Sequence, residues 1–208
     1  MSQIPRRALL VIDVQNEYDS GRLPIEFPPL EESLANIGAA MDAAKLAGIP
    51  VCVVQNSAPE ASPIFARGSD GWQLHPVVAA RARDHLVMKS LPDAFANTDL
   101  AEWLTRNGID TLTVAGYMTH NCDAATIFNA MHRGLVVEFL ADASGSVSYC
   151  NEAGRASASD IHRAFTVVLH SRFAAVANTS DWLQAVKAGQ PLSRSNIIAS
   201  HDAALASH

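Results

Sequence analysis

Short runs of apolar, mostly β-branched residues alternate along this chain with longer stretches in which apolar residues recur at helical spacing. We predict strands in the short runs, at residues 8–12, 51–54, 85–88, 112–115, 135–140 and 173–177. Helices are predicted in the longer stretches, at residues 30–47, 77–83, 98–108, 122–133, 152–169 and 180–187. This alternation favours βαβ units, which build a parallel sheet with helices on both of its faces.

Three segments between these elements need a separate interpretation. Residues 165–169 read FTVVL, which alone would pass for a strand, but Ile161 and Leu169 keep helical spacing, so we predict a helix there. Residues 141–151 are predicted as a loop that leads into this helix. Residues 55–76 are rich in Ser, Pro and Gly and are predicted as a long loop, and loops of that length are usually functional.

The chain length indicates one domain followed by a tail. The 208 residues are enough to bury a core without a metal or a disulfide. We place this α/β domain at residues 1–188. From Gly189 to His208 the composition turns to Ser, Ala, His and Asn, so this tail lacks the apolar density to fold alone. We expect it to be either mobile or packed on a neighbouring subunit.

Charge and cysteine content exclude several classes of protein. The formal net charge is −6 and no long basic run occurs, so the sequence predicts neither a nucleic-acid partner nor an anionic membrane partner. Cys52, Cys122 and Cys150 are widely spaced and form no CxxC pair, which favours a reduced, intracellular protein. The apolar run after the basic start MSQIPRR ends at Asp13 and is too short for a signal sequence. We therefore expect a cytoplasmic protein.

Cys122 occupies a conspicuous position in the stretch from Asp110 to Arg133. The first half of this stretch reads as a strand, Gly116 interrupts it, and the second half has helical spacing. Cys122 is expected where the helix begins, near unpaired backbone N–H groups and the positive end of the helix dipole, both of which favour a thiolate. Cys122 is therefore a candidate nucleophile.

Two further polar residues are expected near Cys122. In sheets of this kind functional residues gather beyond the carboxyl ends of the strands. Asp13 follows the first predicted strand, Lys89 the third and Cys122 the fourth. A thiolate can attack a carbonyl, a carboxylate can move the thiol proton, and an ammonium can hold both anions. We expect these three side chains to meet in one nucleophilic site.

Each of these residues also has a simpler interpretation. Asp13 alone could cap a turn, Lys89 alone could be solvated at a strand end, and Cys122 alone could be a small buried hydrophobic residue. Cys52, inside a predicted strand, is expected in the core, and Cys150 is expected to be an incidental thiol in a loop. Only the joint placement of the first three residues favours catalysis.

Three motifs resemble those of the isochorismatase-like cysteine hydrolases, a superfamily that includes nicotinamidases, N-carbamoylsarcosine amidohydrolase and ureidoacrylate amidohydrolase. They are ALLVIDVQNEY at residues 8–18, VMKSLPDAFANTDL at residues 87–100 and VAGYMTHNCDAATIFNA at residues 114–130. Each motif is modest alone, but their order and spacing are specific. The resemblance covers roughly residues 6–187.

The resemblance implies a fold, a site and a mechanism. The fold is a three-layer α/β/α sandwich with a six-stranded, Rossmann-like parallel sheet of order 3-2-1-4-5-6. Asp13, Lys89 and Cys122 become the catalytic triad. A cis peptide between Tyr117 and Met118 is implied, with the N–H groups of Met118 and Cys122 forming an oxyanion hole. The implied reaction is hydrolysis of a C–N bond through a thioester on the cysteine.

The chain departs from related families at two points. Nicotinamidases carry a metal-binding Asp-x-His after the second strand, where this chain has Gln55, Asn56 and Ser57. His75 falls on a family histidine, but a lone histidine in a turn is more often a hydrogen-bonded loop residue, so we predict no metal and no cofactor. True isochorismatases cleave a vinyl ether and lack the cysteine. The presence of Cys122 therefore favours a C–N hydrolase.

Aromatic residues and one histidine are expected to form the walls of the substrate pocket. The candidates lie in or beside segments at the strand ends and are Tyr18, Trp72, Phe95, Tyr117, His120 and Tyr149. His120 either touches substrate or is simply a loop residue. Because no charged anchor is evident, we expect a small neutral amide or a ureide.

Two alternatives to an amidohydrolase stay open. The first is a vinyl ether hydrolase of the isochorismatase type. The second is a non-catalytic, structural or redox-sensing oligomer that keeps the fold and a reactive thiol. For all three functions a homodimer or homotetramer is expected, because such oligomers are common among related folds and the long tail offers material for an interface.

Overall fold

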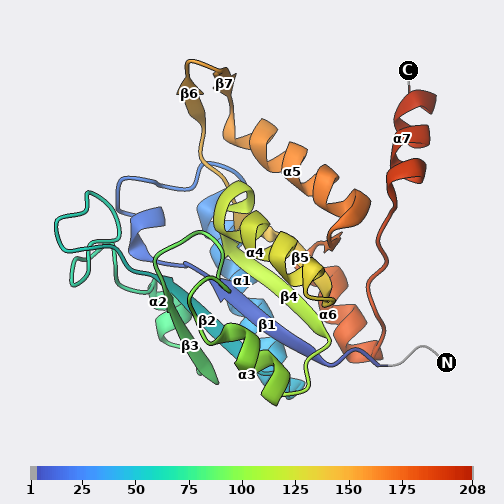
Figure 1. The fold of residues 1–208 in the computed structure, drawn as a ribbon, viewed down its shortest axis with the longest axis horizontal. Coiled ribbons are helices and arrows are strands. Elements are labelled where there is room, and N and C mark those ends of the chain that lie inside the picture. The colour runs from blue at the N-terminus through green and yellow to red at the C-terminus, as the bar shows by residue number, and fades with distance from the viewer. Residues whose placement is uncertain (1–3, 208) are drawn as a thin grey trace.

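The apolar runs of the sequence lie side by side in one parallel sheet (Figure 1). The computed structural model describes residues 4–207 of the chain. In spatial order the strands are β3 (His85–Lys89), β2 (Val51–Asn56), β1 (Arg7–Ile12), β4 (Thr111–Tyr117), β5 (Val136–Gly145) and β8 (Ala175–Ala177). The predicted order 3-2-1-4-5-6 is confirmed, because β8 is the sixth strand of this sheet along the chain.

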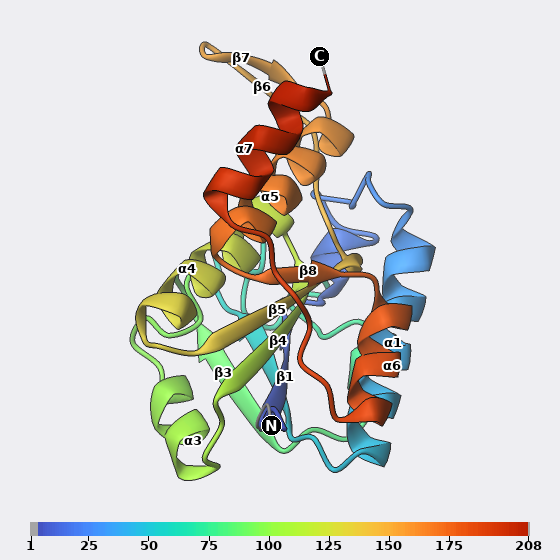
Figure 2. The same ribbon diagram turned by 90° about the vertical axis from the view of Figure 1, so that its right-hand side faces the viewer.

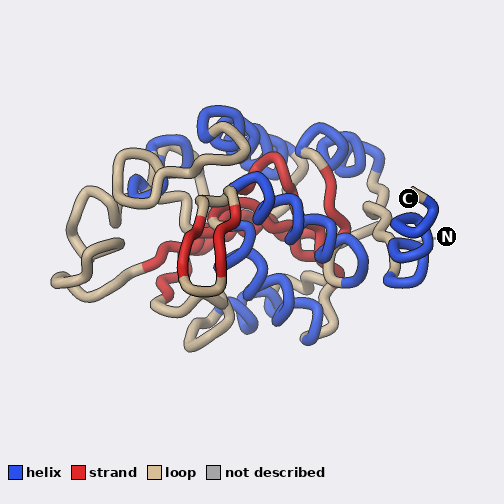
Figure 3. Tube along the Cα trace, turned by 90° about the horizontal axis from the view of Figure 1, so that it is seen from above, coloured by secondary structure: helices blue, strands red, loops and turns tan. Residues whose placement is uncertain are grey.

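Helices cover both faces of the sheet, which confirms the three-layer sandwich (Figures 2 and 3). One layer contains α1 (Leu30–Leu46), α2 (Pro76–Ala79) and α6 (Thr179–Ala188), and the other contains α3 (Leu100–Arg106), α4 (Ala124–His132) and α5 (Ala158–Arg172). Strands β1 and β4 are buried along their whole length, as expected for strands between two helical layers. No helix within residues 4–207 is both long enough and apolar enough to cross a membrane.

Most helices lie where their periodicity predicts. The stretch FTVVL lies inside α5, so the helical interpretation of residues 165–169 is confirmed. The predicted helices at 77–83 and 98–108 are shorter in the structure, because α2 ends at Ala79 and α3 spans only Leu100–Arg106. Helical spacing therefore located the elements more reliably than it located their ends.

The prediction of a loop at residues 141–151 is wrong in detail. Strand β5 continues to Gly145, and a hairpin then precedes α5. The hairpin consists of β6 (Tyr149–Asn151) and β7 (Gly154–Ala156). Helix α5 begins at Ala158 rather than near residue 152, with the Ser157 hydroxyl accepting a hydrogen bond from the N–H of Asp160. The hairpin strands are mostly exposed and have no alternating apolar pattern, so their sequence carries no strand signal.

The C-terminal tail contains a helix of its own, α7 (Ile197–Ala206). The side chain of Asn196 caps it by accepting a hydrogen bond from the N–H of Ala199. None of the residues of α7 is buried, and the helix lies beside α5, outside the two helical layers (Figures 1 and 2). The tail therefore contributes little to the core of the domain.

A buried ion pair ties β1 to β5. The Nη2 atom of Arg7 lies 2.7 Å from Oε1 of Glu138, and both side chains are almost completely buried. The Thr113 hydroxyl and the Trp182 indole N–H also donate to Oε2 of Glu138, at 2.8 and 3.0 Å. The neighbouring pair of Arg6 with Asp110 has a similar distance of 3.0 Å but is largely exposed.

Replacing Arg7 by Met is expected to lower the free energy of unfolding by about 3–5 kcal/mol, because the buried Glu138 charge loses its partner. The matched change Arg6→Met, at the exposed pair, should cost no more than about 1 kcal/mol. Urea denaturation of both variants measures the difference. Equal losses in the two variants would show that burial does not set the importance of the Arg7 pair.

Candidate active site

Three strand ends bring an acid, an amine and a thiol together. Asp13 directly follows β1, Lys89 is the last residue of β3, and Cys122 lies in the turn after β4. The Nζ atom of Lys89 lies 2.7 Å from Oδ2 of Asp13 and 3.2 Å from Sγ of Cys122. All three residues are buried. The structure therefore joins the three residues that the strand-end rule singled out.

Backbone geometry explains how Asp13 and Cys122 come close. Asp13 has a positive φ of 51°, a region that Asp tolerates better than most residues, so the chain turns sharply as it leaves β1. Beside it, Ile12 pairs with Gly116 of β4. A Cβ atom at Gly116 would lie 2.1 Å from the carbonyl oxygen of Ile12, so only glycine allows this approach. The segments carrying Asp13 and Cys122 therefore leave the sheet side by side.

Burial and neighbouring charges set the ionisation of the three groups. Burial raises the pKa of the Asp13 carboxyl, although the Lys89 ammonium acts against this shift. Burial lowers the pKa of Lys89, but the charges of Asp13 and Cys122 outweigh it, so the pKa is raised and the amine stays protonated. Burial and the Asp13 charge raise the pKa of the Cys122 thiol, while Lys89 lowers it only in part. Burial therefore opposes the thiolate that the helix start and Lys89 favour, and the resting thiol carries its proton beside the Asp13 carboxylate.

Cys122 belongs to a single π-helical turn, Thr119–Asp123, that precedes α4. It was expected where the helix begins, and the helix α4 starts two residues later, at Ala124. The peptide between Tyr117 and Met118 just before this turn is cis, as the family resemblance implied. The carbonyl oxygen of Met118 accepts hydrogen bonds from the N–H groups of Asn121 and Asp123, at 3.0 and 3.2 Å. These contacts fold the chain back so that Cys122 faces the strand ends.

Tyr18 and Tyr117, two of the six predicted pocket residues, lie in the interior. Their rings pack edge to face with centroids 5.4 Å apart, and Tyr18 contacts Phe65 in the same manner. The Tyr117 hydroxyl and the Ser33 hydroxyl are 2.7 Å apart. Burial, followed by the charges of Cys122 and Asp13, raises the pKa of Tyr18. Tyr18 therefore lies close to the three polar groups but in the interior, packed against the rings of Phe65 and Tyr117.

His120 and Tyr149 line a cavity under the β6–β7 hairpin. Their rings meet edge to face at 5.1 Å, and the charge of Cys122 contributes to a raised pKa of Tyr149 after burial. The Nδ1 atom of His120 lies 3.1 Å from the Ser146 hydroxyl, whereas its buried Nε2 atom has no hydrogen-bond partner within residues 4–207. The cavity has a volume of about 370 Å³ and is lined by His120, Tyr149, Asn151, Ala153, Gly154, Arg155, Ala156, Ile161 and Phe165.

The two remaining pocket candidates lie elsewhere. Phe95 is buried in the core next to α3 and carries the Arg133 guanidinium 4.8 Å from its ring centroid. Trp72 is half-buried, and its carbonyl oxygen accepts hydrogen bonds from the side chains of Gln15 and Gln55. Neither residue lines the cavity under the hairpin.

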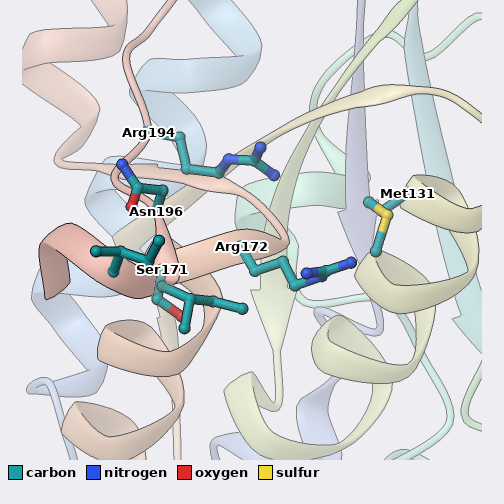
Figure 4. Close-up of a pocket in the computed structure, with 7 residues that line it drawn as sticks. Met131, Ser171, Arg172, Arg194 and Asn196 are labelled. Carbon is teal, nitrogen blue, oxygen red and sulfur yellow. The ribbon is translucent and has the colours of Figure 1, made fainter. Parts of the chain in front are cut away.

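A larger cavity of about 590 Å³ lies where the tail meets α4 and α5 (Figure 4). Met131, Arg172 and Arg194 are among its lining residues, and Asp13, Lys89 and Cys122 are not. Its walls come partly from the segment that leads into α7, so the tail packs against α4 and α5 of its own chain. This cavity is separate from the three strand ends.

The predicted loop after β2 holds its polar residues in hydrogen bonds. Gln55 donates to the Trp72 carbonyl oxygen at 2.8 Å. His75 caps α2 by accepting a hydrogen bond from the N–H of Val77 at 3.2 Å, and its Nε2 atom lies 3.6 Å from the Asp19 carboxylate. These contacts agree with the interpretation of His75 as a hydrogen-bonded loop residue.

Two polar residues beside the nucleophile carry almost no signal in the sequence. Asp123 directly follows Cys122, and Ser144 lies near the end of β5; both side chains are completely buried. The Ser144 hydroxyl donates to Oδ2 of Asp123 at 2.6 Å. The one available signal was an acidic residue at the start of the otherwise apolar stretch that forms α4.

Comparison with known proteins places this chain in one family. The model of the isochorismatase domain matches residues 7–181. A crystal structure from Burkholderia xenovorans LB400, provisionally described as an isochorismatase, is 66% identical, with a TM-score of 0.97 and 98% of each chain covered.

Two curated relatives extend the comparison. The isochorismatase family protein YddQ of Bacillus subtilis is 30% identical over 85% of this chain and 98% of its own. The ureidoacrylate amidohydrolase RutB of Methylobacterium radiotolerans is 27% identical over 83% of this chain and 76% of its own. Because the family model spans most of the chain, this protein belongs to the isochorismatase family, a family of hydrolases with amidohydrolases among its members.

Proposed function

We propose that this protein is a cysteine-dependent hydrolase of a C–N bond in a small amide or ureide. The observation that carries the proposal is the position of Lys89, whose ammonium lies within 2.7 Å of Asp13 and 3.2 Å of Cys122. A thiol, a carboxylate and an ammonium in contact are what nucleophilic attack on a carbonyl requires. The amidohydrolases among the relatives of this chain support the same reaction class.

In the first half of the proposed reaction the thiol proton of Cys122 passes to the Asp13 carboxylate as the sulfur attacks the carbonyl carbon. The C–N bond then breaks, and the Asp13 carboxyl returns the proton to the departing nitrogen. The products are an amine or ammonia and a thioester on Cys122. Lys89 stays protonated throughout and offsets the negative charge, whether that charge is on the oxygen of Asp13 or on the sulfur.

The carbonyl oxygen becomes negatively charged when the sulfur attacks. We assign its stabilisation to the backbone N–H groups of Met118 and Cys122, which lie at the two sides of the turn that carries the nucleophile. In the second half of the reaction, Asp13 takes a proton from water, and the hydroxide attacks the thioester. The acid product leaves, and Cys122 recovers its proton from Asp13. No metal and no cofactor take part in this scheme.

The cavity under the β6–β7 hairpin is the proposed site for the rest of the substrate. Its volume of about 370 Å³ suits a small molecule. His120 and Tyr149 line this cavity, and His120 also belongs to the turn that carries Cys122. Tyr18 and Tyr117, behind the turn, support the wall next to the sulfur. Trp72 and Phe95 do not line this cavity, so their predicted contact with substrate has no support from it.

The alternatives from the sequence have less support. Hydrolysis of a vinyl ether does not call for a thiol next to a buried carboxylate and an ammonium. A purely structural role would leave a buried ion pair beside an unused nucleophile, at a desolvation cost that apolar residues would avoid. We further propose a cytoplasmic homodimer or homotetramer, in which the exposed helix α7 packs on a neighbouring subunit.

A panel of small amides and ureides tests the proposed function through release of ammonia. We expect hydrolysis of at least one neutral member by the wild-type protein and none by Cys122→Ala. The panel should include N-carbamoyl compounds and simple carboxamides, together with one vinyl ether, whose cleavage releases no ammonia and is followed by chromatography of its products. Cleavage of the vinyl ether alone would support isochorismatase-type chemistry, and no reaction with any compound would favour the non-catalytic oligomer.

A further inference from the structure

One serine hydroxyl contacts both ends of the turn that carries Cys122. The turn runs from Thr119 to Asp123. The hydroxyls of Thr119 and Ser144 are 2.8 Å apart, and the Ser144 hydroxyl donates to Oδ2 of Asp123 at 2.6 Å. All three side chains are completely buried. Because Ser144 belongs to β5, which pairs with β4, these bonds hold the turn against the edge of the sheet.

A second set of contacts extends from the first residue of the turn. The hydroxyl of Thr119 also lies 3.1 Å from the carbonyl oxygen of Gly145 and 2.8 Å from Nδ1 of His162 in α5. Burial lowers the pKa of His162 to about 4, so its ring is neutral at physiological pH. A hydrogen-bonded row therefore runs from His162 through Thr119 and Ser144 to Asp123, and it ends on a carboxyl group beside the nucleophile.

The carboxyl of Asp123 lies in an unusual environment. Its Oδ1 atom is buried and has no hydrogen-bond partner within residues 4–207. Burial raises the pKa of Asp123 to about 7; the Ser144 hydrogen bond lowers it, the charge of Asp13 raises it, and Lys89 lowers it. A buried carboxylate without a cation of its own costs stability, and the cost falls when the group takes up a proton.

We propose that Ser144 and Asp123 are positioning residues for the Cys122 nucleophile. Ser144 forms hydrogen bonds at both ends of the turn and so holds the Cys122 sulfur close to Lys89. Asp123 controls the charge beside the thiol: as a neutral acid it permits deprotonation of Cys122, and as an anion it opposes deprotonation. This inference rests on the proposed role of Cys122 as nucleophile and adds two residues that act through it.

The direction of the pH effect follows from the groups that face Asp123. These are Asp13 at the end of β1, Lys89 of β3 and the Ser144 hydroxyl; the Cys122 thiol belongs to the residue that precedes Asp123 in the turn. The buried phenols of Tyr18 and Tyr117 also face it and are neutral, because their pKa values are raised. Lys89 already balances the charge of Asp13. Above pH 7 Asp123 is therefore negatively charged with no cation of its own, and this charge raises the pKa of the Cys122 thiol. The reactivity of Cys122 then increases less with pH than it would beside a neutral residue.

Alkylation by iodoacetamide tests this inference without a substrate. The rate at Cys122 is followed by mass spectrometry between pH 6 and 9 in a Cys150→Ser background, because Cys150 is exposed. Asp123→Asn should react like the parent at pH 6 and about tenfold faster at pH 9, since one pKa unit corresponds to a tenfold effect. Ser144→Ala removes a hydrogen bond that lowers the pKa of Asp123, so this pKa should be higher in the variant. The slowing of Cys122 alkylation by the Asp123 charge should therefore begin at a higher pH than in the parent.

Amide hydrolysis supplies the second measurement. Ser144→Ala should lower kcat by about 10- to 100-fold with KM within about twofold, because misplacement of the sulfur affects chemistry more than binding. Thr113→Val is the matched control: it removes a buried hydroxyl from β4 that bonds Glu138 instead, and it should keep the pH profile of alkylation. An Asp123→Asn profile identical to the parent would overturn the inference, whether or not Ser144→Ala loses activity. Failure of the proposed function would appear separately, as hydrolysis that survives Cys122→Ala.

Discussion

Replacing Cys122 by Ala is expected to lower kcat/KM for amide hydrolysis by about 10⁴-fold or more, to the level of the uncatalysed reaction. The variant lacks the sulfur that lies 3.2 Å from Lys89 and that would form the thioester, and no neighbouring group can replace it as nucleophile. Removal of one atom from a buried residue should leave the fold intact. The measurement is the initial rate of ammonia release at substrate concentrations well below KM.

Two cysteines in the same chain supply matched controls. Cys150 is exposed on the hairpin and Cys52 is buried in β2, and neither contacts Lys89 or Asp13 in the structure. Cys150→Ser and Cys52→Ala should keep kcat within about threefold. Acid quenching of the wild-type reaction should also reveal an acyl group on Cys122 by mass spectrometry. Activity that persists in Cys122→Ala would eliminate the thioester mechanism.

Replacing Lys89 by Met is expected to have the second largest effect, on both activity and stability. Asp13 and Cys122 would lose the cation that contacts both of them, and Asp13 would be left buried without its partner. Loss of one member of a buried ion pair typically costs about 3–5 kcal/mol. Activity should fall by about 10³-fold, because the Asp13 carboxyl then holds its proton and cannot accept that of Cys122.

The pH dependence separates these effects. Without Lys89 the pKa of Asp13 is raised further in the folded protein, so the variant keeps most of its stability at low pH and loses it as the pH rises through the raised value. Urea denaturation at pH 5 and pH 8 measures this trend. The double variant Asp13→Asn with Lys89→Met should recover much of the stability at pH 8 but none of the activity. A single variant as stable as wild type at pH 8 would contradict a charged Asp13 in the resting site.

Much of the fold could be predicted because it depends on local periodicity. Each strand of the central sheet is a short apolar run, and each helix that covers it has an apolar face, so the alternation alone predicts a parallel sheet with two helical layers. The hairpin β6–β7 escaped prediction because its residues are exposed and need no apolar pattern. The helix α7 escaped for a related reason: none of its residues is buried, so the sequence contains no core-facing stripe to identify it.

The candidate site was predictable only in part. Asp13, Lys89 and Cys122 could be named because each follows an apolar run and because parallel strands end at a common edge. The helix start and Lys89 both favour a thiolate at Cys122, whereas burial, which the sequence does not show, raises the pKa of the thiol. Ser144 was not recognised at all, since a serine near the end of a strand has many ordinary roles.

By itself the sequence determined the alternation of elements and the three polar strand ends, because both follow from the pattern of neighbouring residues; the strand order was expected only from the resemblance to a known family. The tertiary structure alone decided that the Lys89 ammonium reaches both Asp13 and Cys122, that all three side chains are buried, and that Ser144 spans the turn. Distances between groups far apart in the chain, and the burial that sets their charges, depend on how the layers pack. A local sequence pattern therefore cannot predict these distances or the burial of these groups.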